Sequence, residues 1–267
     1  MARLALILAY DGSAFQGWQT QPTGRGVQDH LEQALAAIAG HSVATICAGR
    51  TDAGVHGLRQ VVHFDSRAER PASAWVRGVN AHLPPQVAVR EAREVDDAFH
   101  ARYGASLRRY RYLLHRSPVR HPLLSGRAGW TFRPIDTDRL RESASMLVGE
   151  HDFSAFRSSE CQAASPVRRI DSIEVAEHGP LLLMSFVGNA FLHHMIRNIV
   201  GTLLMAADGR RPVEWVGEVL ASRDRRLAAP TFAPDGLYLD GVRYDSRFGV
   251  DSWGPDEGLD GMLAALR

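Results

Sequence analysis

The chain has 267 residues, of which 45% are hydrophobic and 23% charged, the composition of a globular protein with one large or two smaller domains. Its net charge is only +1, so any affinity for nucleic acid has to come from how the charges are distributed. The two cysteines, Cys47 and Cys161, exclude a disulfide framework and a cysteine-rich zinc site. All 31 basic residues are arginine, which excludes lysine-based catalysis. The apolar runs are too short for a membrane span and no signal peptide is evident, so we expect a cytoplasmic protein.

The spacing of apolar residues predicts strands and helices in the first half of the chain. Strands follow from short apolar or alternating runs, and helices from apolar residues at intervals of three and four. The predicted elements are strands at 3–10, 43–47, 60–64 and 87–93, and helices at 27–39 and 74–82. This β-α-β-β-α-β order is the split βαβ arrangement of ferredoxin-like and RNA-recognition folds.

The second half of the chain can be interpreted similarly. The predicted elements are strands at 108–115, 168–176, 181–187 and 237–244, and helices at 138–148, near 191–207 and at 213–221. We therefore expect an α+β fold of two similar split-βαβ halves, with mostly antiparallel sheets, that flank a central catalytic cleft. The halves are expected at residues 1–105 and 106–245, and a peripheral tail at 246–267, where Gly, Asp and Pro become frequent.

The loop Arg50–His56 carries the strongest local indication of chemistry. Two glycines flank the Thr51–Asp52 pair, which allows a tight turn and leaves space beside the Asp52 carboxylate. Arg50 lies two residues away and could steer or screen that carboxylate. The plain structural alternative is an ordinary turn in which Asp52 bonds its own backbone, since Asp and Gly are common in turns.

A second feature is the acid-free stretch between Asp97 and Asp136, where arginines and aromatic residues alternate. Its arginines are Arg102, Arg108, Arg109, Arg111, Arg116, Arg120, Arg127 and Arg133. Arginine binds phosphates with two donors, and aromatic rings stack on bases that leave a helix. In the strand from Arg108 to Tyr112, alternation puts Arg108, Tyr110 and Tyr112 on one face and the other two arginines on the opposite face. The segment therefore suits an RNA-binding cleft, or else an edge strand with inward-packed tyrosines.

The third feature is the segment 189–198, which contains His193, His194 and Arg197. On a helix, adjacent histidines point about 100° apart and do not converge on one ion, so we predict no metal site. Arg197 has largely apolar neighbours, and an arginine in such a place needs a carboxylate or phosphate partner. A structural acid such as Asp208 or Glu218 is the plain alternative for that partner.

Together these motifs resemble the tRNA pseudouridine synthase A family, from about residue 3 to residue 245. The markers, in the order of the family, are YDG at 10–12, GWQ at 17–19, AGRTDAGVH at 48–56, QVVHF at 60–64, RRYRY at 108–112, NAFLHHMIRNIVG at 189–201 and GLYL at 236–239. Several ordered motifs of this length are far more specific than one short pattern.

The resemblance implies an isomerase that converts uridine to pseudouridine at positions 38, 39 and 40 in the anticodon arm of tRNA. It implies Asp52 as the catalytic nucleophile, Tyr110 as the ring that stacks on the uracil, and Arg197 as the ion-pair partner of the aspartate. Arg50 matches a residue that helps to extrude the nucleotide. The family acts as a homodimer, and it needs neither a metal nor an organic cofactor.

The route of the reaction stays open at this stage. A carboxylate can attack C1′ of the ribose or add to C6 of the uracil, and both routes need Asp52 ionised. Two other classes of protein are alternatives: a non-catalytic RNA-binding module built on the same halves, and a carboxylate-based nucleoside hydrolase. The first would lack the aspartate of AGRTDAG, which is present here, and the second would release free uracil.

Overall fold

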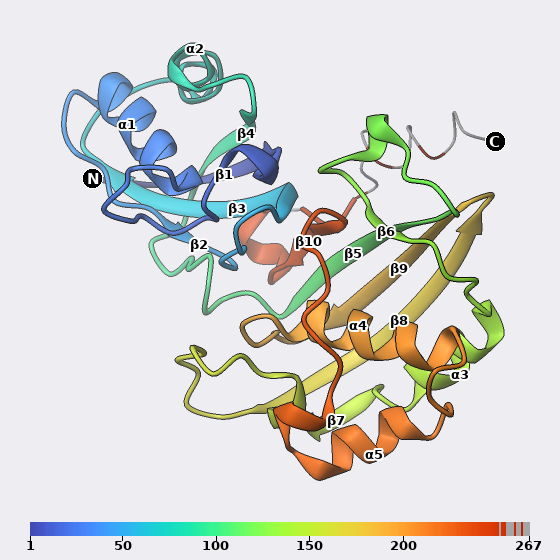
Figure 1. The fold of residues 1–267 in the computed structure, drawn as a ribbon. Coiled ribbons are helices and arrows are strands. Elements are labelled where there is room, and N and C mark those ends of the chain that lie inside the picture. The colour runs from blue at the N-terminus through green and yellow to red at the C-terminus, as the bar shows by residue number, and fades with distance from the viewer. Residues whose placement is uncertain (251, 255–258, 260–262, 264–267) are drawn as a thin grey trace. The chain divides into compact units, whose positions relative to one another are not determined.

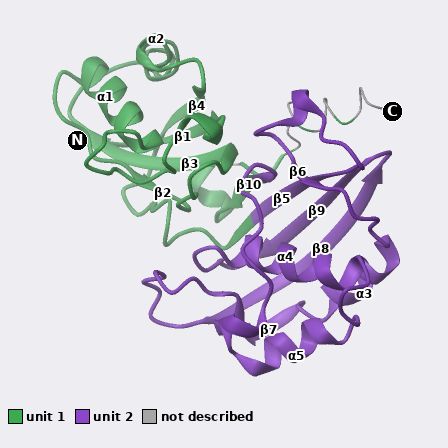
Figure 2. Cartoon of the chain, viewed as in Figure 1, with its two compact units in different colours: residues 1–108, 238–264 green, residues 109–237, 265–267 purple. Residues whose placement is uncertain are grey.

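The computed structural model describes residues 1–250, 252–254, 259 and 263. The chain forms two compact units (Figure 2): the first contains residues 1–108 together with the described residues from 238 onward, and the second contains residues 109–237. Both units combine helices with a sheet, as the sequence predicts (Figure 1). No helix in the described part of the chain is long and apolar enough to cross a membrane.

The first unit contains the β-α-β-β-α-β order that the apolar pattern predicts. Its elements are β1 (Ala2–Tyr10), α1 (Val27–Ala39), β2 (Ile46–Cys47), β3 (His56–Ser66), the π-helical turn η2 (Ala74–Gly78), α2 (Val79–His82), β4 (Val87–Val95) and, from its second residue, β10 (Leu237–Arg243). The strands lie in the order β4-β1-β3-β10, and β2 pairs with β3. β1 runs antiparallel to β3 and β4, whereas β10 runs parallel to β3, with Tyr238 opposite His56.

The core of the first unit lies between the sheet and its helices. The inward face of β1, at Leu4, Leu6 and Leu8, belongs to one cluster with the apolar stripe of α1, which includes Leu31 and Leu35. Alternation along the strand and the three-to-four spacing along the helix produce these two matching faces. The helix pattern predicted over 27–39 is therefore confirmed, with the same bounds.

The second unit combines five strands with three helices among its described residues. Its elements are β5 (Leu107–Arg116), β6 (Gly129–Thr131), α3 (Thr137–Ser145), β7 (Gly149–Asp152), β8 (Val167–His178), β9 (Leu181–Gly188), α4 (Met195–Ala207) and α5 (Trp215–Ser222). The strands lie in the order β5-β9-β8-β7, and β6 pairs in parallel with β5. The three helices contact one another (Figure 1). The short strands β6 and β7 were not predicted, because three or four residues are too few to show a period.

The division of the chain differs from the expected one at its C-terminal end. The last predicted strand was expected in the half 106–245, but β10 pairs with β3 and is grouped with the first unit. The described part of the predicted tail 246–267 is only partly peripheral, because Ser246, Arg247 and Gly249 are exposed whereas Val250 and Ser252 are buried. The Ser252 hydroxyl accepts from Val242 N at 2.9 Å and contacts Val242 O at 2.8 Å. The rest of that tail lies outside the described residues.

Candidate active site

Asp52 is the first residue of a β-turn that leads into β3. The turn is closed by a hydrogen bond from Val55 N to Asp52 O at 3.1 Å. Gly54 has φ +80° at the third position of the turn, and Ala53 has no positive φ, which is the pattern of a type II turn. Only glycine adopts that third conformation without strain. The local sequence Asp-Ala-Gly-Val therefore sets the backbone at Asp52, whose side chain is half-buried.

Contacts from other segments of the first unit hold the residues just before this turn. The carbonyl of Thr51 accepts from Trp18 N at 3.0 Å, and the Thr51 hydroxyl lies 2.9 Å from the Tyr10 hydroxyl. Two residues before Thr51, the carbonyl of Gly49 accepts a hydrogen bond from Gln60 Nε2 at 2.6 Å. Each of these partners is buried, so the position of the loop is fixed by packed groups before any substrate binds.

The residues just after the turn are fixed by a close approach of two backbones. Gly12 N donates to Nδ1 of His56 at 3.1 Å. A Cβ atom on Gly12 would lie 1.9 Å from Val55 O, so no larger residue fits there without moving the turn. The glycine of the YDG motif thus has a packing role next to the Asp52 loop.

Arg108 has a different role from the phosphate contact that its sequence context suggested. Its side chain is buried, and Nε and Nη2 donate to Ala48 O at 3.2 and 3.1 Å. Nη2 also donates to Arg102 O at 2.7 Å. Arg108 therefore anchors the start of the Asp52 loop. Its Nε and Nη2 donors are occupied by these backbone carbonyls, so a phosphate contact through them would require breaking these bonds.

The other arginines of the acid-free stretch do not form one basic surface either. Arg111 is buried, Arg116 donates to Glu177 at 2.5 Å, and Arg133 Nε lies 3.8 Å from Asp208. Sequence spacing misses the two acids because Glu177 and Asp208 lie 61 and 75 residues further along the chain than their arginines. Phosphate contacts stay a prediction for the exposed members of the stretch, which are Arg102, Arg120, Arg127 and Arg133.

Arg50 lies in the same loop as Asp52, and its side chain is exposed. The half-buried Asp52 and the exposed Arg50 thus stand two residues apart on a fixed backbone. An exposed guanidinium there is able to contact an RNA phosphate without leaving the loop. Its role in extruding the nucleotide stays a prediction.

Tyr110 lies on β5 of the second unit, 7% exposed. Its ring meets the Phe191 ring edge-on, with 5.3 Å between centroids. β5 is a strand over this segment, so Tyr110 and Arg111 point to opposite faces, but Arg111 is buried rather than exposed for a phosphate. Tyr112 is fully buried, and its hydroxyl donates to Ala233 O at 2.8 Å, the inward packing that was the plain alternative.

Arg197 is the third residue of α4 and is half-buried. Its Nε donates to Phe232 O at 2.9 Å, and Phe232 N donates back to Arg197 O at 3.2 Å. Neither of the two structural acids considered as its partner, Asp208 and Glu218, forms an ion pair with Arg197 in the described part of the chain. Asp208 accepts from Arg210 Nε at 2.8 Å, and Glu218 forms no ion pair among the described residues.

A buried polar network beside Arg197 was missed by the sequence analysis. Asn198 is fully buried, and its Nδ2 donates to Phe156 O at 2.8 Å. Its Oδ1 accepts from the Thr231 hydroxyl at 2.7 Å and from Arg225 Nη2 at 3.0 Å. The usable signal was Asn198 itself, because a buried amide in an apolar helix requires partners elsewhere.

The sequence analysis placed His193 and His194 on a helix, but both residues precede the helix. α4 begins at Met195, and His194 precedes it with φ +62° as its N-cap residue. The rings of His193 and His194 lie 4.0 Å apart between centroids. The argument that helical spacing separates the two side chains therefore does not apply to them, and the expected absence of a metal stays a prediction.

The four predicted site residues are divided between the units: Asp52 and Arg50 belong to the first, Tyr110 and Arg197 to the second. Each pair has a well-defined setting in its own unit. Their convergence in a central cleft stays a prediction of the sequence.

A family model described as tRNA pseudouridine synthase matches residues 6–104 and 143–245. The chain belongs to the tRNA pseudouridine synthase family. The matched ranges include Arg50, Asp52 and Arg197, whereas Tyr110 lies between them.

Individual relatives agree with the family assignment over nearly the whole chain. A tRNA pseudouridine synthase A of Bordetella petrii is 58% identical over 250 residues, which cover 93% of each chain. That of Bordetella parapertussis is 55% identical over 253 residues and 94% of each chain. That of Methylibium petroleiphilum is 57% identical over 244 residues, 91% of this chain and 94% of the relative. Among solved structures, a chain of the archaeal box H/ACA sRNP Nop10-Cbf5 complex aligns with 91% of this chain and 49% of its own, at 13% identity and a TM-score of 0.37.

Proposed function

We propose that this member of the tRNA pseudouridine synthase family isomerises uridine to pseudouridine at positions 38, 39 and 40 in the anticodon stem-loop of tRNA, with Asp52 as the nucleophile. Identity of 55–58% to proteins named tRNA pseudouridine synthase A supports the activity. The observation that supports the role of Asp52 most directly is its place in a type II turn braced by buried partners on both sides.

The reaction rearranges one nucleotide without adding or losing atoms. The N1–C1′ bond breaks, the uracil turns, a C5–C1′ bond forms, and the C5 proton moves to solvent while N1 gains one. An ionised carboxylate at residue 52 can trap the ribose at C1′ or add to C6 of the base, and the two routes stay alternatives. Enclosure by substrate raises the pKa of a carboxyl, so a nearby cation is required to keep it ionised.

We assign that cation to Arg197, the stacking face to Tyr110, and help in nucleotide extrusion to Arg50. A guanidinium held through Nε by Phe232 O presents its two Nη groups in a fixed direction, which suits a carboxylate. The nearly buried Tyr110 ring, supported at its edge by Phe191, suits a base that has left its stack. The resemblance supports a cytoplasmic homodimer that works without a metal or organic cofactor.

Asp52→Asn is the decisive test because it keeps the side-chain volume and removes the nucleophile. Pseudouridine formation is measured on an unmodified tRNA transcript by tritium release from 5-tritiated uridine, and mapped at 38–40 by carbodiimide treatment and primer extension. We expect a loss of about 10³-fold or more, with tRNA binding retained. Asp138→Asn is the matched control, because that side chain is 95% exposed on α3.

Three outcomes would contradict the proposal. Substantial turnover by the Asp52 variant would remove it as the nucleophile. Release of free uracil by the unaltered protein would indicate a hydrolase, and tRNA binding without conversion would indicate a non-catalytic RNA-binding module.

A further inference from the structure

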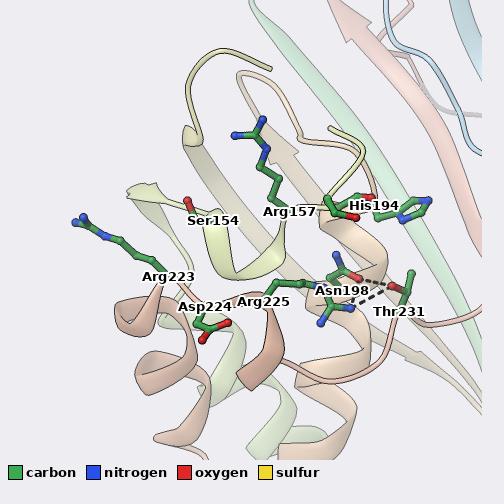
Figure 3. A pocket seen from close by; sticks show the side chains of 10 residues that line it. Ser154, Arg157, His194, Asn198, Arg223, Asp224, Arg225 and Thr231 are labelled. Atoms are coloured by element: carbon green, nitrogen blue, oxygen red, sulfur yellow. Dashed lines mark hydrogen bonds between the residues drawn. The ribbon is translucent and has the colours of Figure 1, made fainter. Parts of the chain in front are cut away.

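The second unit contains a pocket that none of the four predicted site residues lines. Its volume is about 620 Å³, and it opens between the turn η4 (Ser154–Phe156), α4 and the segment that follows α5 (Figure 3). The lining residues are Ser154, Arg157, Ser158, Ser159, His194, Asn198, Arg223, Asp224, Arg225 and Thr231. Three arginines, three serines and one threonine make it a pocket of hydrogen-bond donors.

The charges of the pocket do not cancel. Asp224 is the single acid in the lining, and its carboxylate already accepts from Arg226 at 2.7 Å (Nη2) and 3.0 Å (Nε). Arg223 lies 3.5 Å from Asp152, which is outside the lining. Among the described residues, Arg157 and Arg225 have no carboxylate partner. The lining therefore carries an excess of positive charge.

Arg225 fixes part of that charge at the floor of the pocket. Its Nη2 donates to Asn198 Oδ1 at 3.0 Å and to the Thr231 hydroxyl at 3.2 Å, and its Nη1 donates to Ala229 O at 2.9 Å. All of these acceptors are neutral, so they satisfy the donors but leave the charge uncompensated. Burial lowers the pKa of Arg225. A neighbouring carboxylate would raise that pKa, so the direction agrees with the absence of one.

The side chains of Arg157 and Arg223 lie on either side of Ser154 and point away from Asn198 and Thr231 (Figure 3). Arg157 is held by Nη2, which donates to Cys161 O at 2.6 Å and Ala163 O at 2.8 Å. The side chain of Arg223 is 68% exposed. Guanidinium groups from separate segments, with serine hydroxyls in the same lining, are a donor set that binds a phosphate group.

We propose that this pocket binds a phosphodiester group of the substrate RNA backbone, as a contact separate from the nucleotide that reacts. The inference rests on the proposed function, which supplies the RNA. A backbone phosphate fits better than a free nucleotide, because donors dominate the lining and its only ring on which a base could stack is that of His194, with no Phe, Tyr or Trp. The neutral acceptors that hold Arg225 keep the cation in place for an anion that arrives with the substrate.

The test compares tRNA binding by Arg223→Gln, by Arg157→Gln/Arg223→Gln and by the matched control Arg141→Gln. Arg141 lies on α3 of the same unit, and its charge is already paired with Asp138 at 3.1 Å. Anisotropy of a fluorescein-labelled tRNA transcript gives Kd at several salt concentrations. We expect the double variant to raise Kd about tenfold and to reduce the slope of log K against log salt by about 0.7 to 0.9 for one lost phosphate contact.

The Arg223 single variant guards against misfolding, since its exposed side chain can be removed with little effect on packing; we expect its Kd to rise about threefold. The control should stay within twofold. Equal losses in the control and double variants would overturn the proposal, because they would show a general charge effect. A further experiment measures thermal stability with added inorganic phosphate. If phosphate stabilises the unaltered protein but not the double variant, while both proteins bind tRNA with equal affinity, the pocket is a site for a free anion instead.

Failure of this inference differs from failure of the proposed function. A double variant that binds tRNA like the unaltered protein, while the latter forms pseudouridine, removes only the phosphate pocket. An unaltered protein that forms no pseudouridine removes the proposed function.

Discussion

The Asp52 loop of the first unit and the segment 228–232 beside Arg197 in the second unit are held by different kinds of contact. The loop depends on backbone shape: a turn with a left-handed glycine at its third position, and Gly12 packed against Val55 O. The segment depends on side chains, since Arg225 and Asn198 hold it through Thr231, Ala228 and Ala229. In the first, steric fit of the backbone is added to hydrogen bonds from buried side chains, whereas in the second the buried hydrogen bonds carry the arrangement.

This difference determines which substitutions each place tolerates. Around Asp52, added volume is harmful because the neighbouring atoms belong to the backbone and cannot rotate away. Beside Arg197, the loss of a polar atom is harmful because its partners stay buried without a bond. The two regions can therefore be separated experimentally by choosing the type of substitution.

The largest effect is expected for Gly12→Ala. Its new Cβ would lie 1.9 Å from Val55 O, so the turn or the YDG segment has to shift. We expect a loss of about 2–4 kcal/mol in the free energy of unfolding of the first unit. Hydrogen exchange followed by mass spectrometry measures this separately for the two units.

Gly217→Ala is the control for that substitution. A Cβ at residue 217, in α5, has as its nearest neighbour Met146 Sδ at 3.4 Å, an ordinary contact. Alanine favours a helix over glycine by up to about 1 kcal/mol, so this variant should be neutral or slightly more stable. Equal destabilisation by both variants would show that backbone crowding does not distinguish the Asp52 loop.

Asn198→Ala is expected to have the next largest effect, confined to the second unit. It leaves Phe156 O without its donor and takes one acceptor from both Arg225 and Thr231. We expect a loss of about 2–3 kcal/mol, measured by the same exchange experiment. Faster exchange in the loop 48–56 rather than in α4 would contradict the separation of the two regions.

Acid is expected to destabilise the first unit more than the second, by a smaller amount. His63 on β3 is buried and accepts from Ala101 N at 3.1 Å. Burial, then nearby His100 and Arg3, lower its pKa to about 4, against a partial opposing effect of Asp65. The unfolded chain binds a proton near pH 6.5 and the folded chain does not until about pH 4, so stability falls as pH decreases through that window.

The expected loss by pH 5 is about 1–2 kcal/mol relative to pH 7.5. Urea unfolding followed by hydrogen exchange at several pH values measures it. His63→Gln should flatten the dependence of the first unit between pH 6.5 and 4; an unchanged dependence in that variant would contradict the assignment to His63.

The sequence was informative where structure depends on neighbours in the chain. The helix over 27–39 and the turn at Asp52 follow from local spacing and from the position of Gly54. Partners distant in the chain were not predictable: the bonds from Arg108 to Ala48 O and from Arg225 to Asn198 join segments 60 and 27 residues apart. The pairing of β10 with β3 was missed for the same reason, because neither strand identifies its neighbour.

Ser252 sets a practical limit on how far the chain can be shortened. The family match ends at residue 245, yet the hydroxyl of Ser252 satisfies both the N–H and the C=O of Val242 inside the first unit. A chain ended at 245 would leave both of these buried backbone groups without the partner that Ser252 provides, which costs stability. Shortened versions should therefore keep Ser252 if the first unit is to remain stable.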